Sequence, residues 1–210
     1  MKRDEQRNAT RQGLAEAALG AFLDRGLEAV TVEEIAAAAG VSPRTFFLHF
    51  ASKAAAVFPD HDDNLHDFRA ALAALPTGTD DVVGVCHLVV QGVRQQSAST
   101  FRRRRYDLVH TVPAVRDVDA RTDRDYEDAV AEHLRGRWGD DPDAVLAALV
   151  VANIVIGVAR AALVCWGRDG SDPVESTRRL LDRLLVPPLH GLAGRTPAGR
   201  DLAGQGLGML

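Results

Sequence analysis

Residues 40–50, GVSPRTFFLHF, combine side chains that can read DNA with side chains that can anchor a helix in a protein core. Arg44 can donate two hydrogen bonds to a guanine edge. Thr45 or Leu48 can contact the methyl group of a thymine. These residue types, so close together, predict a helix whose outer face enters the major groove of double-stranded DNA.

Charged groups around this helix suit the phosphate backbone. His49 and Lys53 can donate hydrogen bonds to phosphate oxygens, and Thr31, at the start of the preceding helix, offers a further helix-end contact. The sequence from residue 35 to residue 59 contains no aspartate or glutamate. The alternative is that these residues form an ordinary solvated surface over a small core, because arginine and lysine are usually exposed.

The elements that must hold these residues can be read from local signals. Ser42 predicts the N-cap of the recognition helix, and Pro43 fits its first turn because that amide has no partner within the helix. Phe46 and Phe50, four residues apart, should face inward. Gly40 can adopt the left-handed backbone of the tight turn before them. Two short helices joined in this way form a helix-turn-helix.

The remaining sequence is also helical in pattern. Thr31 and Glu34 have the spacing of a capping box, and no run of alternating apolar and polar residues predicts a strand. We therefore expect an all-α fold of about nine helices, over residues 4–25, 31–40, 42–50, 52–75, 80–99, 101–112, 114–138, 143–166 and 173–186. The predicted domains are a DNA-binding unit (1–53), a helical ligand-binding and dimerisation body (54–186) and a Gly/Pro-rich tail (187–210).

Composition limits the classes of protein. The 210 residues carry a formal net charge of −4, and the only cysteines are Cys86 and Cys165. Two distant cysteines in apolar segments do not form a disulfide framework, so we expect a reducing, cytoplasmic location and no export. Residues 144–166 are long enough to span a bilayer, but Asn153 and Arg160 favour a helix buried in protein.

The residue types also allow two other kinds of site to be considered for this sequence, a metal site and an enzyme active site. Asp62 and His66, four residues apart in an acidic run at residues 60–67, could supply two metal ligands, but a solvated turn is the favoured interpretation. No motif of a hydrolase, phosphate loop or metalloprotease is present, which argues against an enzyme. We expect no cofactor.

The run TVEEIAAAAGVSPRTFFLHFASKAAAVF, residues 31–58, resembles the DNA-binding region of TetR-family transcriptional regulators. The resemblance implies a homodimer that represses transcription from a palindromic operator and leaves the DNA when a small hydrophobic effector enters its body. An activator is the alternative. The DNA-contacting positions are Thr31, Ser42, Pro43, Arg44, Thr45, Phe47, Leu48, His49 and Lys53. Phe47 departs from the commoner tyrosine and cannot donate to a phosphate.

The body carries a second resemblance. The segments VFPDHDD and YDLVHTVPAV are similar to the mycofactocin-type branch of the family, which implies an acyl-CoA-like effector. A drug-like or aromatic metabolite is the alternative. The expected pocket residues are Val85, Leu88, Val89, Phe101, Arg105, Leu108, Tyr126, Leu149 and Asn153.

Within the run Arg102–Arg105 the side chains point about 100° apart, so they cannot all face one ligand. Arg105 is the inward candidate, because Phe101 and Leu108 share its side of the helix. Asn153 and Arg160 form a polar stripe that must face either the ligand or a second subunit. The apolar helices at residues 143–166 and 173–186 form the expected dimer interface.

Overall fold

The computed structural model describes residues 2–76 and 80–185, with side chains from residue 5 onward, and the regular elements in these ranges are all helical. The all-α prediction is therefore confirmed. The predicted tail at 187–210 lies outside the described residues. The elements are α1 (Lys2–Arg25), α2 (Val32–Ala38), α3 (Pro43–His49), the 3₁₀ helix η1 (Ala54–Val57), α4 (His61–Ala73), α5 (Asp81–Ser97), α6 (Thr100–Thr111), α7 (Pro113–Trp138), α8 (Pro142–Asp169) and α9 (Pro173–Leu184).

The caps of the helix-turn-helix form as local sequence predicts. The Thr31 hydroxyl accepts from the Glu34 amide at 3.2 Å, and the Glu34 carboxylate accepts from the Thr31 amide at 2.8 Å. At α3 the Ser42 hydroxyl accepts from the Thr45 amide at 3.2 Å, with Pro43 in the first turn. Gly40 has φ +69°, which a side chain would strain. Both helix starts are therefore fixed by neighbours in sequence.

The predicted long helix from Ser52 to Leu75 is wrong, because it is divided near Pro59. Ser52 does accept from the Ala55 amide, at 3.2 Å, but it starts only the short helix η1. Pro59 has no amide hydrogen to continue a helix, and α4 begins afresh at His61. Because the helix is interrupted here, the Val57 carbonyl and the Asp60 side chain can accept hydrogen bonds from neighbouring helices.

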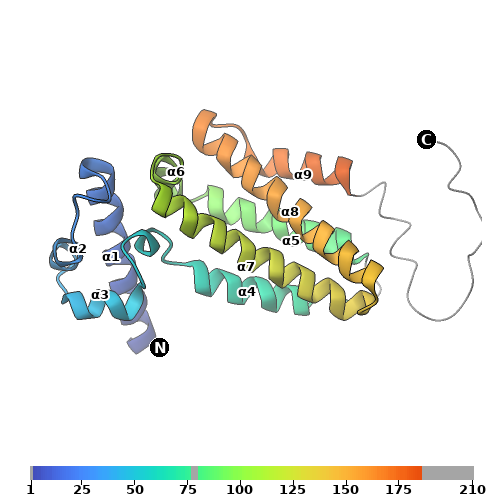
Figure 1. Ribbon diagram of the computed structural model, residues 1–210, viewed down its shortest axis with the longest axis horizontal. Helices are drawn as coiled ribbons and strands as arrows, with labels where there is room; N and C mark the ends of the chain where they lie inside the picture. The colour runs from blue at the N-terminus through green and yellow to red at the C-terminus, as the bar shows by residue number, and fades with distance from the viewer. Residues whose placement is uncertain (1, 77–79, 186–210) are drawn as a thin grey trace, which may run out of the picture.

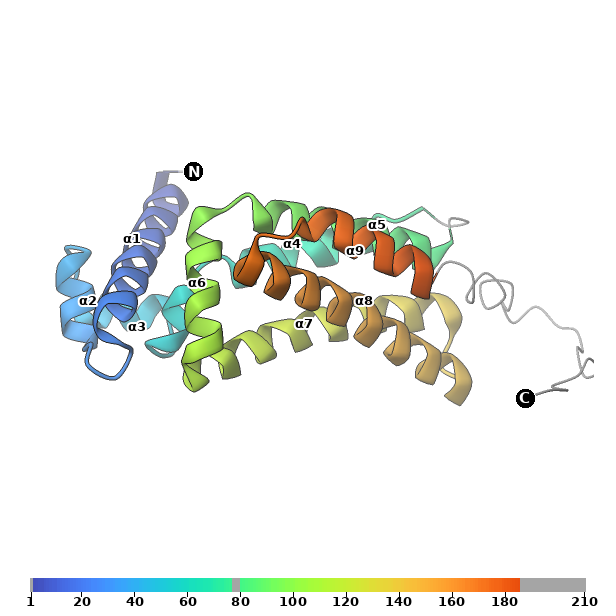
Figure 2. The ribbon, with the colours of Figure 1, turned by 90° about the horizontal axis from the view of Figure 1, so that it is seen from above.

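The molecule is elongated, with α1–α3 at one end (Figure 1). Helices α4, α5, α7, α8 and α9 run along the body, whereas α6 lies across it next to α1 (Figure 2). Gly167 on α8 lies against Tyr106 on α6, where an added Cβ would come within 2.9 Å of the tyrosine Cβ. Helix α6 therefore contacts both α1 of the helix-turn-helix unit and α8 of the body.

Two apolar clusters form the core. The first lies within the body and includes Leu134, Val155 and Leu181. The second is the core of the N-terminal unit, and four residues of α6 and α7 join it: Leu108, Val109, Val115 and Val118. The N-terminal unit thus shares its core with the body, and the domain boundary at residue 53 stays a prediction.

Helix α8 is long and apolar enough to cross a membrane by length and composition. Half of its most apolar window is buried inside this fold, where it packs against α5, α7 and α9. A core helix of a globular protein has the same composition, so α8 is weak support for a membrane span.

Candidate functional site

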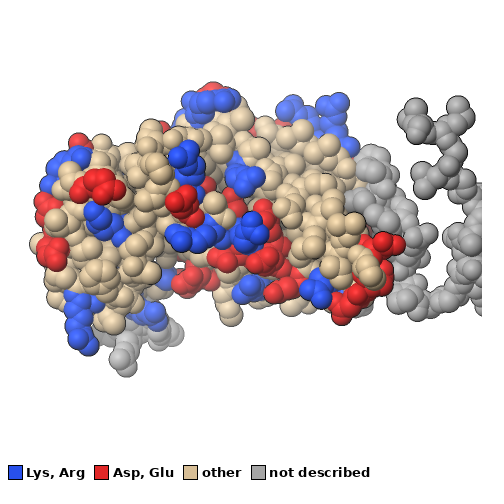
Figure 3. Space-filling model, viewed as in Figure 1, with Lys and Arg blue, Asp and Glu red and all other residues tan. Residues whose placement is uncertain are grey.

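Helix α3 presents its predicted reading face to solvent. Phe46 is fully buried and Phe50 is 6% exposed, as their spacing predicts. On the opposite side Arg44 is exposed, Phe47 is 60% exposed and Leu48 is 70% exposed. In Figure 3 basic side chains, drawn in blue, project beside α3. Two large exposed apolar side chains next to an arginine form a surface that can meet base edges and methyl groups.

The other predicted contact residues around α3 occupy its first turn or the preceding helix end. Thr31, Ser42 and Pro43 are exposed. Thr45 is half-buried, and its hydroxyl lies 2.9 Å from that of Ser42. The hydroxyls of Ser42 and Thr45 are therefore already in hydrogen-bond contact with each other.

Lys53 and His49 are placed differently from a pair of free phosphate donors. The Lys53 ammonium donates to the carbonyl of Leu27 at 2.9 Å and to that of Val30 at 2.8 Å. His49 is half-buried, and burial, followed by the charges of Arg7 and Arg11, lowers its pKa. Lys53 thus ties the turn between α1 and α2 in this structure, and His49 favours its neutral form.

The body contains a pocket of about 220 Å³ between α4, α5, α6, α7 and α8. Five of the expected ligand residues line it, namely Leu88, Val89, Phe101, Arg105 and Tyr126. Polar side chains from the same helices share the wall, among them Asn64, Gln91 and Thr122. The pocket is therefore mixed, with aromatic faces and several hydrogen-bonding groups.

Four expected ligand residues lie outside this pocket. Val85 is fully buried in the body core, and Leu108 belongs to the core of the N-terminal unit. Leu149 is 44% exposed, and Asn153 is exposed, with its amide donating to the Leu149 carbonyl at 2.9 Å. Helix α8 is apolar around most of its circumference, so its periodicity did not reveal which side faces the pocket.

The four arginines of α6 have four different surroundings. Arg102 lies 3.4 Å from Asp60, and Arg104 lies 3.5 Å from Glu16. The Arg103 guanidinium lies 5.6 Å from the centre of the Trp166 ring. Arg105 points inward as predicted and is 8% exposed. One residue of the run is thus a buried cation at the pocket wall.

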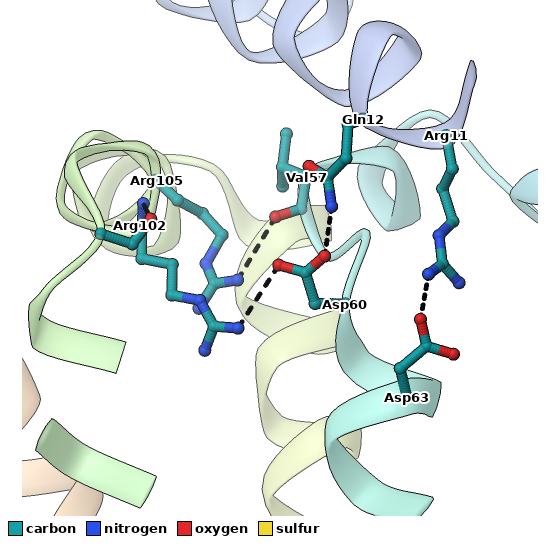
Figure 4. Close-up of polar contacts among 8 residues, drawn as sticks. Arg11, Gln12, Val57, Asp60, Asp63, Arg102 and Arg105 are labelled. Atoms are coloured by element: carbon teal, nitrogen blue, oxygen red, sulfur yellow. Dashed lines mark hydrogen bonds and ion pairs between the residues drawn. The ribbon is translucent and has the colours of Figure 1, made fainter. Parts of the chain in front are cut away.

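The acidic run at residues 60–67 is a contact region and not only a solvated turn. Asp60 accepts from Gln12 of α1 and pairs with Arg102 of α6, and Asp63 pairs with Arg11 of α1 (Figure 4). Sequence patterning missed these contacts because their partners are distant in the chain. Asp62 and His66 are exposed, and no group of three or more possible metal ligands occurs among residues 5–76 and 80–185.

Carboxyl groups in the pocket have raised pKa values. Burial, reinforced by the neighbouring Asp119 carboxylate, raises the pKa of Asp123 to about 7, although Arg160 lies 3.5 Å away. Burial also raises the pKa of Asp119, and it raises the pKa of Tyr126 to about 12. Burial thus disfavours the charged form of these carboxyl groups, and a protonated carboxyl group is a weak partner for a cation.

Family models match both parts of this architecture. Residues 14–57 match the model of bacterial regulatory proteins of the tetR family, and residues 84–187 match the MftR C-terminal domain. Together these matches cover more than half of the chain. The protein belongs to the TetR family of transcriptional regulators, a family that is typically non-enzymatic.

Two relatives support the same assignment. TcmR, an HTH-type transcriptional regulator of Streptomyces glaucescens, is 43% identical over 76 residues, which cover 36% of this chain and 34% of that protein. MftR of Mycobacterium tuberculosis, named as a mycofactocin biosynthesis transcriptional regulator, is 24% identical over 168 residues, which cover 79% of this chain and 84% of that one. The C-terminal domain is thus of the MftR type.

Solved structures share the fold. The TetR-family repressor FadR of Thermus thermophilus, solved with lauroyl-CoA, has a TM-score of 0.56 at 20% identity and covers 93% of this chain and 99% of its own. NalD of Pseudomonas aeruginosa, the secondary repressor of a multidrug efflux pump, has a TM-score of 0.58 at 19% identity, with 83% and 94% covered.

Proposed function

We propose that this protein is a cytoplasmic, homodimeric repressor that binds a palindromic operator through α3 and releases it when a small hydrophobic effector fills the pocket. The proposal rests mainly on the outer face of α3, from which Arg44, Phe47 and Leu48 project. Phe46 and Phe50 anchor the opposite face of this helix in the core. A helix held from behind and apolar or basic in front suits the major groove.

The homodimer is supported by an exposed apolar face on the last two helices. Leu146, Leu149 and Val150 of α8 are 61%, 44% and 48% exposed, and Leu180 and Leu184 of α9 are 37% and 50% exposed. Figure 3 has a largely uncharged area over α8. Such a face is expected to be covered, and a second copy would present the matching surface.

Two effector classes fit the body in different ways. A fatty acyl-CoA is supported by the MftR-type domain and by FadR, whose structure holds lauroyl-CoA. An aromatic metabolite is supported by the pocket wall, to which Phe58, Phe68, Phe101, Tyr106 and Tyr126 contribute. In both cases the effector would act by shifting the equilibrium between DNA-binding and DNA-free conformations.

The first test is fluorescence anisotropy on labelled DNA from immediately upstream of the protein's own gene, compared with shuffled DNA of equal length. Tight, salt-sensitive and sequence-selective binding is expected. Two recognition helices should contact half-sites about 34–36 Å apart, one turn of DNA. Equal binding to a library of fragments covering the whole genome and to shuffled DNA would show that the protein has no specific operator.

The dimer has its own test. Val150→Glu should place a charge in the proposed interface, lower the mass measured by light scattering to that of one chain, and weaken operator binding. Glu132→Gln, an exposed substitution on α7, is the control. A monomeric wild-type protein would refute the dimer.

A further inference from the structure

Arg105 is a buried cation for which the described part of the protein supplies no counter-ion. Three arginines line the pocket, and two have acidic partners: Arg102 with Asp60 at 3.4 Å and Arg160 with Asp123 at 3.5 Å. None of the ion pairs among residues 5–76 and 80–185 includes Arg105. Asp60 and Asp119 act on Arg105 only at longer range.

The hydrogen bonds of Arg105 are also incomplete. Its Nη1 donates to the Val57 carbonyl at 3.4 Å, a long contact, and its buried Nε has no acceptor. The guanidinium lies 4.4 Å from the centre of the Phe58 ring. A guanidinium remains protonated in proteins and has five donors in a planar fork. Unpaired burial of such a group is unfavourable, so the site is built for an added acceptor.

The acceptor that fits is an oxyanion, and in a pocket of about 220 Å³ with an aromatic wall a compact carboxylate suits better than a bulkier phosphate. Two parallel oxygens match the fork of a guanidinium, and they supply the negative charge that the pocket lacks next to Arg105. Among the described residues, neither Asp119 nor Asp123 forms an ion pair or a hydrogen bond with Arg105, and Asp123 pairs instead with Arg160 at 3.5 Å. The ligand's own charge would be neutralised by the same contact that satisfies Arg105.

The size and wall of the pocket limit the rest of the ligand. An engineered cavity of about 150 Å³ binds benzene, so a pocket of 220 Å³ suits one or two fused rings with a small substituent. Phe58, Phe68, Phe101 and Tyr126 supply ring faces and edges that stack well on a planar ligand. A complete acyl-CoA is larger than this space, so only part of it could lie inside the pocket, and its thioester carries no carboxylate.

We infer that the effector of this protein is a compact aromatic carboxylic acid whose carboxylate pairs with Arg105 while its ring lies among the aromatic side chains of the pocket. The inference rests on the proposed function, of which it specifies the effector. The carboxylate would replace the Val57 carbonyl as the acceptor for Arg105. Val57 belongs to η1, which joins the N-terminal unit to α4. Loss of the hydrogen bond to its carbonyl would therefore be transmitted to the helix-turn-helix.

The test compares acids with uncharged analogues of the same shape by isothermal titration calorimetry on the full chain without DNA. The probes are benzoate, salicylate and 2-naphthoate, each with its primary amide, and lauroyl-CoA. At least one acid should bind about tenfold or more tightly than its amide, because only the acid supplies a charge-assisted pair. Equal affinity of acid and amide, or failure of all three acids to bind at millimolar concentration, would overturn the inference.

Variants locate the charge. Arg105→Gln should abolish the preference for acid over amide, and Arg105→Lys, which keeps the charge and loses the fork, should reduce it. Arg104→Gln, on an exposed neighbour in the same run, should leave the preference unchanged. A preference that persists in both Arg105 variants would overturn the assignment, and Arg105→Lys provides the result if Arg105→Gln does not fold.

The outcome is separable from that of the proposed function. Ligand discrimination is measured without DNA, and operator binding is measured without ligand. Tight, chain-length-dependent binding of acyl-CoA with no binding of the acids would sink the aromatic acid and leave the repressor intact. Discrimination between acid and amide without any operator would leave the ligand site intact and remove the repressor.

Discussion

Asp60 Oδ2 lies 3.4 Å from Nη2 of Arg102, which links the start of α4 to the pocket-lining helix α6. The other oxygen of the same carboxylate accepts from Gln12 of α1 (Figure 4). A single side chain that also lines the pocket therefore contacts both the ligand-binding body and the first helix of the helix-turn-helix unit. This arrangement offers a short physical connection between the pocket and the helix-turn-helix unit.

Asp60→Asn should weaken the coupling between effector and operator. The amide keeps the shape of the carboxylate but loses the charge that attracts Arg102. Effector binding at the pocket should therefore have a smaller effect on α1. Coupling free energies between two sites are typically about 1–3 kcal/mol, and we expect the operator Kd to change several-fold less on adding effector. Anisotropy titrations with and without a bound effector measure this change.

Asp62→Asn is the matched control, because Asp62 is exposed and lies outside the pocket. It should respond to the effector as the wild type does. If Asp60→Asn and Asp62→Asn respond alike, Asp60 has no part in coupling.

Arg44→Ala should reduce operator binding without affecting folding. Arg44 is exposed on α3, and its loss removes one base contact per half-site, worth about 1–3 kcal/mol. Preference should relax at one base pair, as measured with a set of singly substituted operators. An equal loss on shuffled DNA would instead assign Arg44 to the phosphate backbone.

Lys53→Met should lower the stability of the protein. The sequence pattern alone predicts a uniform loss of DNA affinity from a phosphate-binding lysine, but the ammonium donates to the carbonyls of Leu27 and Val30. Two charged hydrogen bonds lost from a half-buried position should cost about 2–4 kcal/mol of unfolding free energy. Chemical denaturation measures this loss, and Arg44→Ala serves as the folding control. If Lys53→Met leaves the stability unchanged, the expected contact of Lys53 with a DNA phosphate becomes the better explanation of its role.

Asp123 should make stability fall as pH rises towards neutrality. Its pKa is raised to about 7 from the ordinary 3.8. Between these two pH values the folded protein therefore holds a proton that the unfolded chain has largely released. The stabilising contribution of the protonated group is complete below about pH 4 and is lost as pH rises through 7. Asp119, whose pKa is also raised, should act in the same direction.

Asp123→Asn should therefore flatten the dependence of Tm on pH between 4 and 7, although the part due to Asp119 should remain. Asp128→Asn, at an exposed position on the same helix, should keep the wild-type slope. Identical slopes in all three proteins would show that Asp123 titrates normally.

Much of the helix-turn-helix unit follows from sequence alone. The Thr31–Glu34 box, the Ser42 cap and the inward pair Phe46 and Phe50 depend on contacts within one or two helical turns. Such contacts are present in the sequence pattern itself, so their prediction requires no knowledge of the rest of the chain. The same reasoning placed Arg105 inside, because its apolar neighbours define one side of α6.

The tertiary structure decided which neighbour covers each face. Leu149 and Asn153 lie outside the pocket because α8 is apolar around most of its circumference, and periodicity cannot orient such a helix. Asp60 has partners 42 and 48 residues away, and Lys53 has partners 23 and 26 residues away, at distances in sequence that no local pattern encodes. The sequence by itself thus determined most of the helices, the caps of the helix-turn-helix and the inward and outward faces of α3, whereas packing determined the break before α4, the pocket wall and its connection to α1.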